Sequence, residues 1–423
     1  MTNNLLRSYK EATKDTTLLT TLLFDVYEKI TTDPRCQGTK AQASHISGAL
    51  ALVKLRGLDH FKEPSQVQIL QRIESHSVSS SIITGSLPSD TLLELRHHLD
   101  TALTSPTPLT NLASAISKIM LNYGRLRRES REGILSRSEF IQLSADLDDR
   151  FEDLVNGVPA NGIPTTTHLT EKSDRCFHGY YHVYAHRNVC TTMNMLRVAR
   201  IGLNESLLEH YTSIETVYSE ELARKAETNI TRLVNEILAS IPRYTDCSNG
   251  AVDRLPPESL KSFTSSTSSS TSTSTAANKS LSHDLSSSKA IGHTKTDAYA
   301  WPQILPGQLI TPTVKRGSHA HSPRHVTDCH ILLWPMYAAG RAKINFNAHD
   351  SDAVDFDGVS GGDVGSGSEK GEVKAWILKE FKYMADHFGL RNAEIVRGIL
   401  EDGESDMDAW EVYGVLGGYA FNA

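Results

Sequence analysis

The 423-residue sequence has few cysteines, no long apolar run and no excess of positive charge. Its cysteines are odd in number and lie far apart, which favours reduced thiols over a disulfide framework. No uninterrupted apolar stretch approaches the roughly 20 residues of a membrane helix, and the first residues lack the apolar core of a signal peptide. We therefore expect a soluble intracellular protein with no membrane partner. The cysteines are Cys36, Cys176, Cys190, Cys247 and Cys329.

Motifs of nucleotide-binding and metalloprotease sites are missing as well. The sequence contains no Gly-x-Gly-x-x-Gly, no Gly-x-x-x-x-Gly-Lys phosphate loop and no His-Glu-x-x-His. Gly361 and Gly362 would suit a phosphate cradle, but the aspartates at 352, 355, 357 and 363 would repel phosphate. An enzyme is therefore unsupported, and we assign no catalytic residue, no metal ligand and no cofactor.

The charge balance argues against direct DNA recognition. The net charge is −7, whereas a surface made for phosphate contacts is basic. Arg125, Arg127, Arg128 and Arg131 form a small basic cluster that could serve nuclear import or an acidic partner. Two glutamates dilute the cluster, and the helix dipole favours positive charge at a helix end. We interpret it as a solvated helix end and expect no specific DNA binding by this chain.

A row of histidines is the one pattern that resembles a metal site. His178, His182 and His186 recur every four residues, which would place three imidazoles on one face of a helix. A zinc site of this kind needs ligands from a second element, and nothing forces His325, Cys329 or His330 to lie nearby. Tyrosines share the segment, so aromatic packing is our interpretation.

The most continuously apolar stretch runs from Cys329 to Arg341 and centres on Trp334. It has no polar face, so we expect neighbouring elements to cover it on several sides. Pro335 disfavours a helical backbone at the residue before it, and Gly340 offers a left-handed stop. We predict two half-helices with a bend.

Downstream, Ile377, Phe381, Met384 and Phe388 form one helical stripe, and Gly389 follows it as a C-cap would. A second helix is expected over 392–401, and its inward residues are predicted to be Ile395, Ile399 and Leu400.

The remaining chain also shows helical spacing, with no alternating strand pattern of useful length. We predict an all-α fold, a multi-helix bundle or solenoid-like single domain over 1–423. A Ser/Thr-rich segment at 259–290 and a Gly/Asp-rich segment at 350–371 are expected to be flexible insertions. The other helices are predicted at 4–30, 41–55, 64–73 and beyond, 91–103, 109–126, 140–155, 178–208 and 213–238.

Several segments together resemble a known family. Leu-Leu-Trp-Pro-Met-Tyr-Ala-Ala-Gly-Arg, followed after a loop by Val-Lys-Ala-Trp-Ile-Leu-Lys-Glu-Phe and His-Phe-Gly-Leu-Arg-Asn-Ala, resembles the C-terminal end of fungal-specific transcription factor domains. The similarity recurs at 45–57 and around 196–208, and so spans most of the chain in order. These segments are packing signatures, not catalytic ones.

The resemblance implies the regulatory half of a zinc-cluster transcription factor. Its DNA-binding module needs six closely spaced cysteines, which this sequence does not contain. We therefore expect a nuclear, or alternatively cytoplasmic, regulator that acts through a small effector or through protein partners. Those partners would be the transcription machinery or a DNA-binding subunit, and the chain could form a homodimer or heterodimer. The alternative is a helical small-ligand-binding accessory protein or enzyme of a metabolic pathway, in which the histidine row does chemistry.

Overall fold

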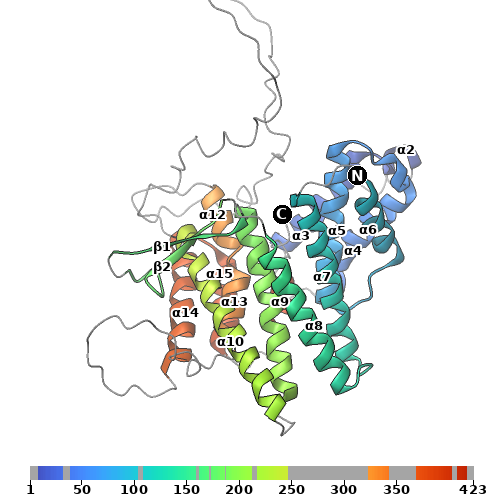
Figure 1. The fold of residues 1–423 in the computed structure, drawn as a ribbon. Coiled ribbons are helices and arrows are strands. Elements are labelled where there is room, and N and C mark those ends of the chain that lie inside the picture. The colour runs from blue at the N-terminus through green and yellow to red at the C-terminus, as the bar shows by residue number, and fades with distance from the viewer. Residues whose placement is uncertain are drawn as a thin grey trace, which may run out of the picture. The chain divides into compact units, whose positions relative to one another are not determined.

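The structure is a computed structural model. It describes residues 8–31, 39–102, 108–158, 162–170, 173–185, 187–211, 217–245, 323–342, 368–402 and 407–416. All of them belong to one compact unit, Met1–Asp246 together with Pro306–Ala423. Helices dominate the described residues, which confirms the all-α prediction (Figure 1). The proposed insertion at 259–290 lies outside the described residues, as does 350–367.

The N-terminal part is a series of helices in which sequence neighbours pack against one another. Two of these helices are followed by glycines in the left-handed region, since Gly57 after α4 and Gly85 after α5 have φ of 83° and 66°. Helix α8 begins with a capping box: the Ser136 side chain accepts from the Glu139 backbone N–H, and the Glu139 carboxylate accepts from the Ser136 backbone N–H. The elements are α2 (Tyr9–Ala12), α3 (Asp15–Thr31), α4 (Thr39–Arg56), η2 (Leu58–His60), α5 (Pro64–Thr84), α6 (Asp90–Ala102), α7 (Pro108–Arg131) and α8 (Arg137–Asn156).

A β-hairpin interrupts the helices, where the sequence had predicted a helix from 178. Strand β1 (Thr165–His168) pairs antiparallel with β2 (Tyr180–Val183), with Thr165 opposite Val183 and His168 opposite Tyr180. The hairpin lies against α10 and α11. The prediction was wrong because a four-residue strand is stabilised by its partner strand and by the helices behind it, and neither is visible in local spacing.

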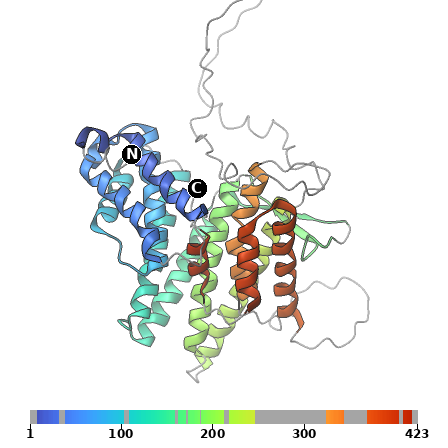
Figure 2. The ribbon, with the colours of Figure 1, turned by 180° about the vertical axis from the view of Figure 1, so that it is seen from behind.

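The centre of the unit is the antiparallel pair α9 (Arg187–Tyr211) and α10 (Val217–Ser240), followed by α11 (Pro242–Thr245). In Figures 1 and 2, α7 and α8 lie on one side of this pair, and α13, α14 and α15 lie on the other. Helix α9 is consequently buried almost all round in its middle, including two arginines, Arg197 and Arg200. Burial on every side requires partners for those charges.

The C-terminal helices cover the apolar stretch as predicted, but the bend lies elsewhere. Helix α12 ends at His330 and α13 begins at Leu333, so the break falls at 331–332, before Trp334. Pro335 occupies the first turn of α13, where a missing N–H costs no helical hydrogen bond. Gly340 does not stop the helix; it is buried inside α13, where an added Cβ would lie 2.8 Å from Leu400 Cδ2. The elements are α12 (Pro323–His330), α13 (Leu333–Arg341), α14 (Ser368–Phe388), α15 (Arg391–Asp402) and α16 (Ala409–Val415).

The predicted stripe on α14 is confirmed, since all four of its residues are buried and Gly389 has φ of 69°. Residues 368–371, expected within a loop, form the first turn of this helix. On α15 the buried residues are Ala393, Val396 and Leu400, so two of the three predicted inward positions were wrong. None of the described helices combines the length and the apolar content needed to cross a bilayer.

Candidate functional site

The histidine row does not lie on a helical face. His182 lies within β2, His178 lies in the turn before it, and His186 is outside the described residues. The His178 ring is stacked on Tyr180 at 5.7 Å, and its Nε2 bonds to Asn235 Oδ1 at 2.9 Å. The row is thus part of an aromatic ladder on the hairpin, which fits the packing interpretation.

The residues that could have supplied zinc ligands from a second element, Cys329 and His330, make contacts of other kinds. His330 is only part-exposed, and desolvation lowers the pKa of its imidazole to about 4; its Nε2 lies 3.0 Å from Asn392 Nδ2. The Cys329 thiol donates to the Tyr244 carbonyl at 3.1 Å. The His325 side chain is outside the described set. Within the part of the chain that the structure describes, no group of three His, Cys, Asp or Glu residues has the arrangement of a metal site.

The hairpin is fastened to α14 through the turn that precedes β2. Arg175 binds both carboxylate oxygens of Glu380, at 2.8 and 3.0 Å, and its guanidinium lies over the Tyr383 ring. Glu380 is fully buried, and burial raises the pKa of its carboxyl against the opposing effect of Arg175. Trp376 adds a hydrogen bond from Nε1 to the Asp174 carbonyl at 3.0 Å. These contacts hold the hairpin against α14.

Helix α16 is held by an aromatic cluster formed by Tyr123 of α7, Trp334 of α13, and Trp410 and Tyr413 of α16 itself. Trp334 is only 2% exposed, and its ring lies 4.9 Å from Trp410 and 4.5 Å from Tyr413. Its Nε1 donates to the Ala409 carbonyl at 2.6 Å, and Trp410 Nε1 donates to the Tyr123 hydroxyl at 3.0 Å. The residue at the centre of the apolar stretch is therefore a packing residue, as the sequence predicted.

The arginine cluster is not a free basic patch. Arg127 and Arg131 both bind Asp408, at 2.7 and 2.5 Å, while Arg125 pairs with Glu129 of the same helix and Arg128 with Glu132 just after its end. Asp408 also caps α16 by accepting from the Trp410 backbone. Burial would raise the pKa of Asp408, but the arginines outweigh it and hold the pKa below its ordinary value. This clamp joins α7 to the C-terminal end of the described chain.

A second buried charge network joins α8, α9 and α10. The Asp148 carboxylate accepts from Arg200 Nε and Nη2 at 2.8 and 3.0 Å, and from the amides of Asn204 and Asn229 at 3.0 Å each. Arg200 also reaches Glu152 at 3.2 Å. The carboxylate thus has four donors, which is the number it can accept. A group satisfied in this way is structural and not available for proton transfer.

The cysteine and tyrosine side chains near this network are also buried and hydrogen-bonded. Burial raises the pKa of the Cys190 thiol to about 11 and that of the Tyr184 hydroxyl to about 12, so neither is ionised near neutral pH. Tyr184 accepts from Arg197 at 2.8 Å, and Asn194 donates to Ser240 at 2.9 Å. A nucleophile needs a lowered pKa or an adjacent base, and these groups have neither.

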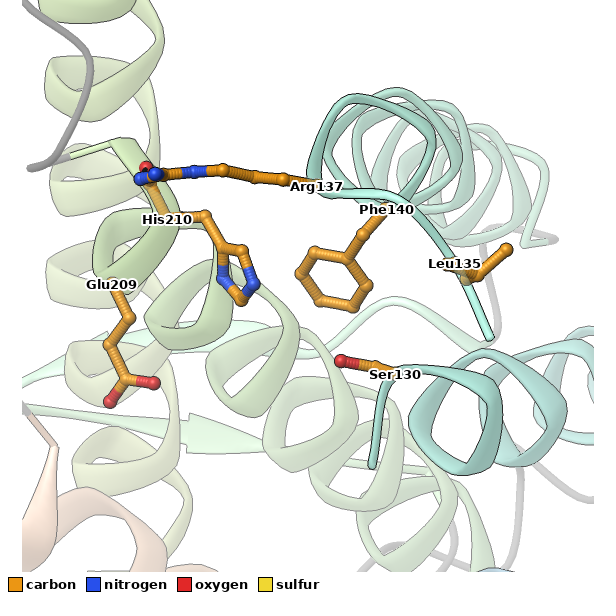
Figure 3. Close-up of a pocket in the computed structure, with 6 residues that line it drawn as sticks. All are labelled: Ser130, Leu135, Arg137, Phe140, Glu209 and His210. Carbon is orange, nitrogen blue, oxygen red and sulfur yellow. Dashed lines mark hydrogen bonds between the residues drawn. The ribbon is translucent and has the colours of Figure 1, made fainter. Parts of the chain in front are cut away.

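An open depression of about 420 Å³ lies where the end of α7 and the start of α8 meet the end of α9. Figure 3 shows the Phe140 and His210 rings facing each other there, with the Ser130 hydroxyl pointing toward them. The two rings lie 4.5 Å apart, and Arg137 donates to the His210 carbonyl. Glu209 and Leu135 complete the lining. Sequence reasoning gave no sign of this depression, because its residues come from two distant segments.

No protein-family model, no curated protein and no solved structure matches this chain. One further pattern, Gly-x-Ser-x-Gly around Ser360, has the spacing of a hydrolase nucleophile turn, but it lies outside the described residues. Within those residues the polar networks are therefore best understood as fold determinants, and the depression is the one candidate site open to solvent that we assign.

Proposed function

We propose that this chain is a helical regulatory domain that controls transcription by contact with other proteins. Its partners would be components of the transcription machinery or a separate DNA-binding subunit, and a second copy of the chain is a further possible partner. The place of action would be the nucleus. The chain itself would not recognise DNA sequence.

The observation that carries this proposal is that the charged side chains of the interior bind one another and so hold the fold together. Asp148, Arg197, Arg200, Glu380 and Asp408 all bind groups on other elements of the fold, and each pair fixes how two elements pack. An enzyme keeps some of its titratable groups exposed to a substrate cavity. A domain that works by surface recognition needs a rigid helical scaffold instead, which is the arrangement described here.

The resemblance to fungal-specific transcription factor domains supports the same proposal from a different direction. Its segments coincide with α13, α14 and the start of α15, and with buried positions of α4 and α9. They are the parts that build the core, so the resemblance is one of scaffold. What it adds is the expected role in gene regulation.

A tethering experiment tests the proposal. The chain is fused to an unrelated sequence-specific DNA-binding domain and expressed in a fungal cell with a matching reporter gene. We expect reporter expression to change in either direction relative to the DNA-binding domain alone. A fusion that is folded and nuclear but leaves the reporter unchanged at several fusion points would contradict the proposal.

A gel-shift experiment tests the statement about DNA. The purified chain should form no discrete, sequence-selective complex at roughly physiological salt, where non-specific binding weakens. A complex that persists there and prefers one promoter sequence would show that the chain reads DNA directly. Metal analysis of the same preparation distinguishes this proposal from the alternative of an enzyme or ligand-binding accessory protein. A stoichiometric metal ion would favour that alternative.

A further inference from the structure

Ser130 lies at a point where a sequence pattern and the surface depression coincide. Arginines precede it by five, three and two residues, namely Arg125, Arg127 and Arg128. Arginine-directed serine/threonine kinases select substrates with this spacing, because acidic residues in their clefts bind the guanidinium groups. In the folded chain these arginines pair with Glu129, Asp408 and Glu132, so a kinase would bind them only when the last turn of α7 opens.

The structure places the Ser130 hydroxyl within reach of solvent. Ser130 is part-exposed and lines the depression (Figure 3). It lies in the last turn of α7, which ends at Arg131 and is followed by Gly133 with φ of 65°. Terminal turns open more readily than helix interiors, and opening is what a kinase needs to bind the segment in extended form.

The opposite wall of the depression offers cationic groups. Arg137 lies across it, and a guanidinium has five N–H donors, so it can bind a phosphate while donating to the His210 carbonyl. His210 Nδ1 lies 2.8 Å from the Ser206 carbonyl, so Nε2 is the ring nitrogen that would contact a phosphate. The Glu209 carboxylate also lines the depression, on the same end of α9 as His210 (Figure 3).

We propose that Ser130 is a phosphorylation site for an arginine-directed kinase, and that Arg137 and His210 receive its phosphate. In the transfer, the bond between the γ-phosphorus of ATP and its bridging oxygen breaks and a bond to Ser130 Oγ forms. ADP leaves, and the hydroxyl proton passes to the base of the kinase. The dianion then links the end of α7 to α8 and α9 by charge-assisted hydrogen bonds.

The test has two parts, and the first asks whether the folded chain is a substrate. The purified full chain is incubated with ATP and the catalytic subunit of cyclic-AMP-dependent protein kinase, and the sites are mapped by mass spectrometry. We expect near-stoichiometric phosphate on Ser130, none there in Ser130→Ala, and at least a tenfold slower reaction in Arg128→Gln. Labelling at other serines only, or at Ser130 only after denaturation, would overturn the proposal.

The second part asks where the phosphate goes. Its second ionisation is followed by phosphorus NMR as a function of pH, in the folded protein and in urea. Phosphoserine titrates near pH 6, and an adjacent cation is expected to lower this by about one unit. Arg137→Gln should abolish most of the shift, whereas Arg150→Gln, an exposed arginine on the same helix, should not. Equal titration in the folded wild type and Arg137→Gln would refute the role of Arg137.

Discussion

Replacing Trp334 by alanine should destabilise the protein severely without removing any group that does chemistry. The side chain is 2% exposed and packs on Trp410 and Tyr413. Truncating a buried aromatic residue costs about 3–5 kcal/mol, and loss of the hydrogen bond from Nε1 to the Ala409 carbonyl costs about 1 kcal/mol more. The sum is a large part of the roughly 5–15 kcal/mol that stabilises a domain.

The measurement is the urea midpoint of the wild type, Trp334→Ala, Trp334→Phe and Trp376→Ala. We expect Trp334→Ala to lose most, and Trp334→Phe to lose less because it keeps part of the packing. Trp376→Ala is the matched control, since that tryptophan is part-exposed and forms a single hydrogen bond to the Asp174 carbonyl. If Trp334→Ala kept the wild-type midpoint but abolished the reporter response of the fusion, Trp334 would be a contact residue for a partner and the packing argument would be wrong.

Three further outcomes follow from particular contacts. Gly340→Ala should lower the free energy of unfolding by about 1–3 kcal/mol, because the added Cβ clashes with Leu400. Gly398→Ala should raise it by about 0.5–1 kcal/mol, because an added Cβ there meets nothing within 4 Å. Thermal melts of both variants test these two values. Burial would raise the pKa of Asp408, but the two arginines of α7 hold it below the ordinary value of 3.8. The ionised carboxylate therefore stabilises the fold at neutral pH, and this contribution is lost as the pH falls below 3.8. The drop in urea midpoint between pH 6 and pH 3 should consequently be smaller in Asp408→Asn than in the wild type. Burial raises the pKa of Cys190 to about 11, so a thiol reagent at pH 8 should label it only at the rate of unfolding, and fast labelling in the native state would contradict the burial.

The sequence predicted best where structure is decided locally. The stripe from Ile377 to Phe388 needed only the 3.6-residue period and a glycine at the end, and all of it is buried. On α15 the period was right but its phase was not, because Ile395 and Ile399 are part-exposed while the smaller Ala393 and Val396 face the core. Size and hydrophobicity alone do not determine which side of a short helix meets a neighbour.

The errors arose where distant segments determine the local conformation. The strand at Tyr180–Val183 exists because Thr165–His168 pairs with it, and a helical reading of the histidines could not include that partner. Gly340 was interpreted as a stop because its conformational freedom is a local property, whereas its actual constraint is the contact with Leu400, sixty residues later. The pairing of the α7 arginines with Asp408 is equally invisible in the sequence, since 277 and 281 residues separate the partners.

The buried charges also determine how loss of function should be interpreted. Removing one member of a buried pair leaves the other uncompensated and costs about 3–5 kcal/mol, whereas replacing both by apolar residues of similar volume is often neutral. Arg200→Ala would therefore silence a reporter by unfolding α8, α9 and α10, even though Arg200 is only 1% exposed. Only variants at exposed positions that keep the wild-type midpoint can map a contact surface. Ile134 and Leu143, 60% and 42% exposed beside the α7–α8 turn, meet that requirement, because their truncation removes little buried area and so separates recognition from folding.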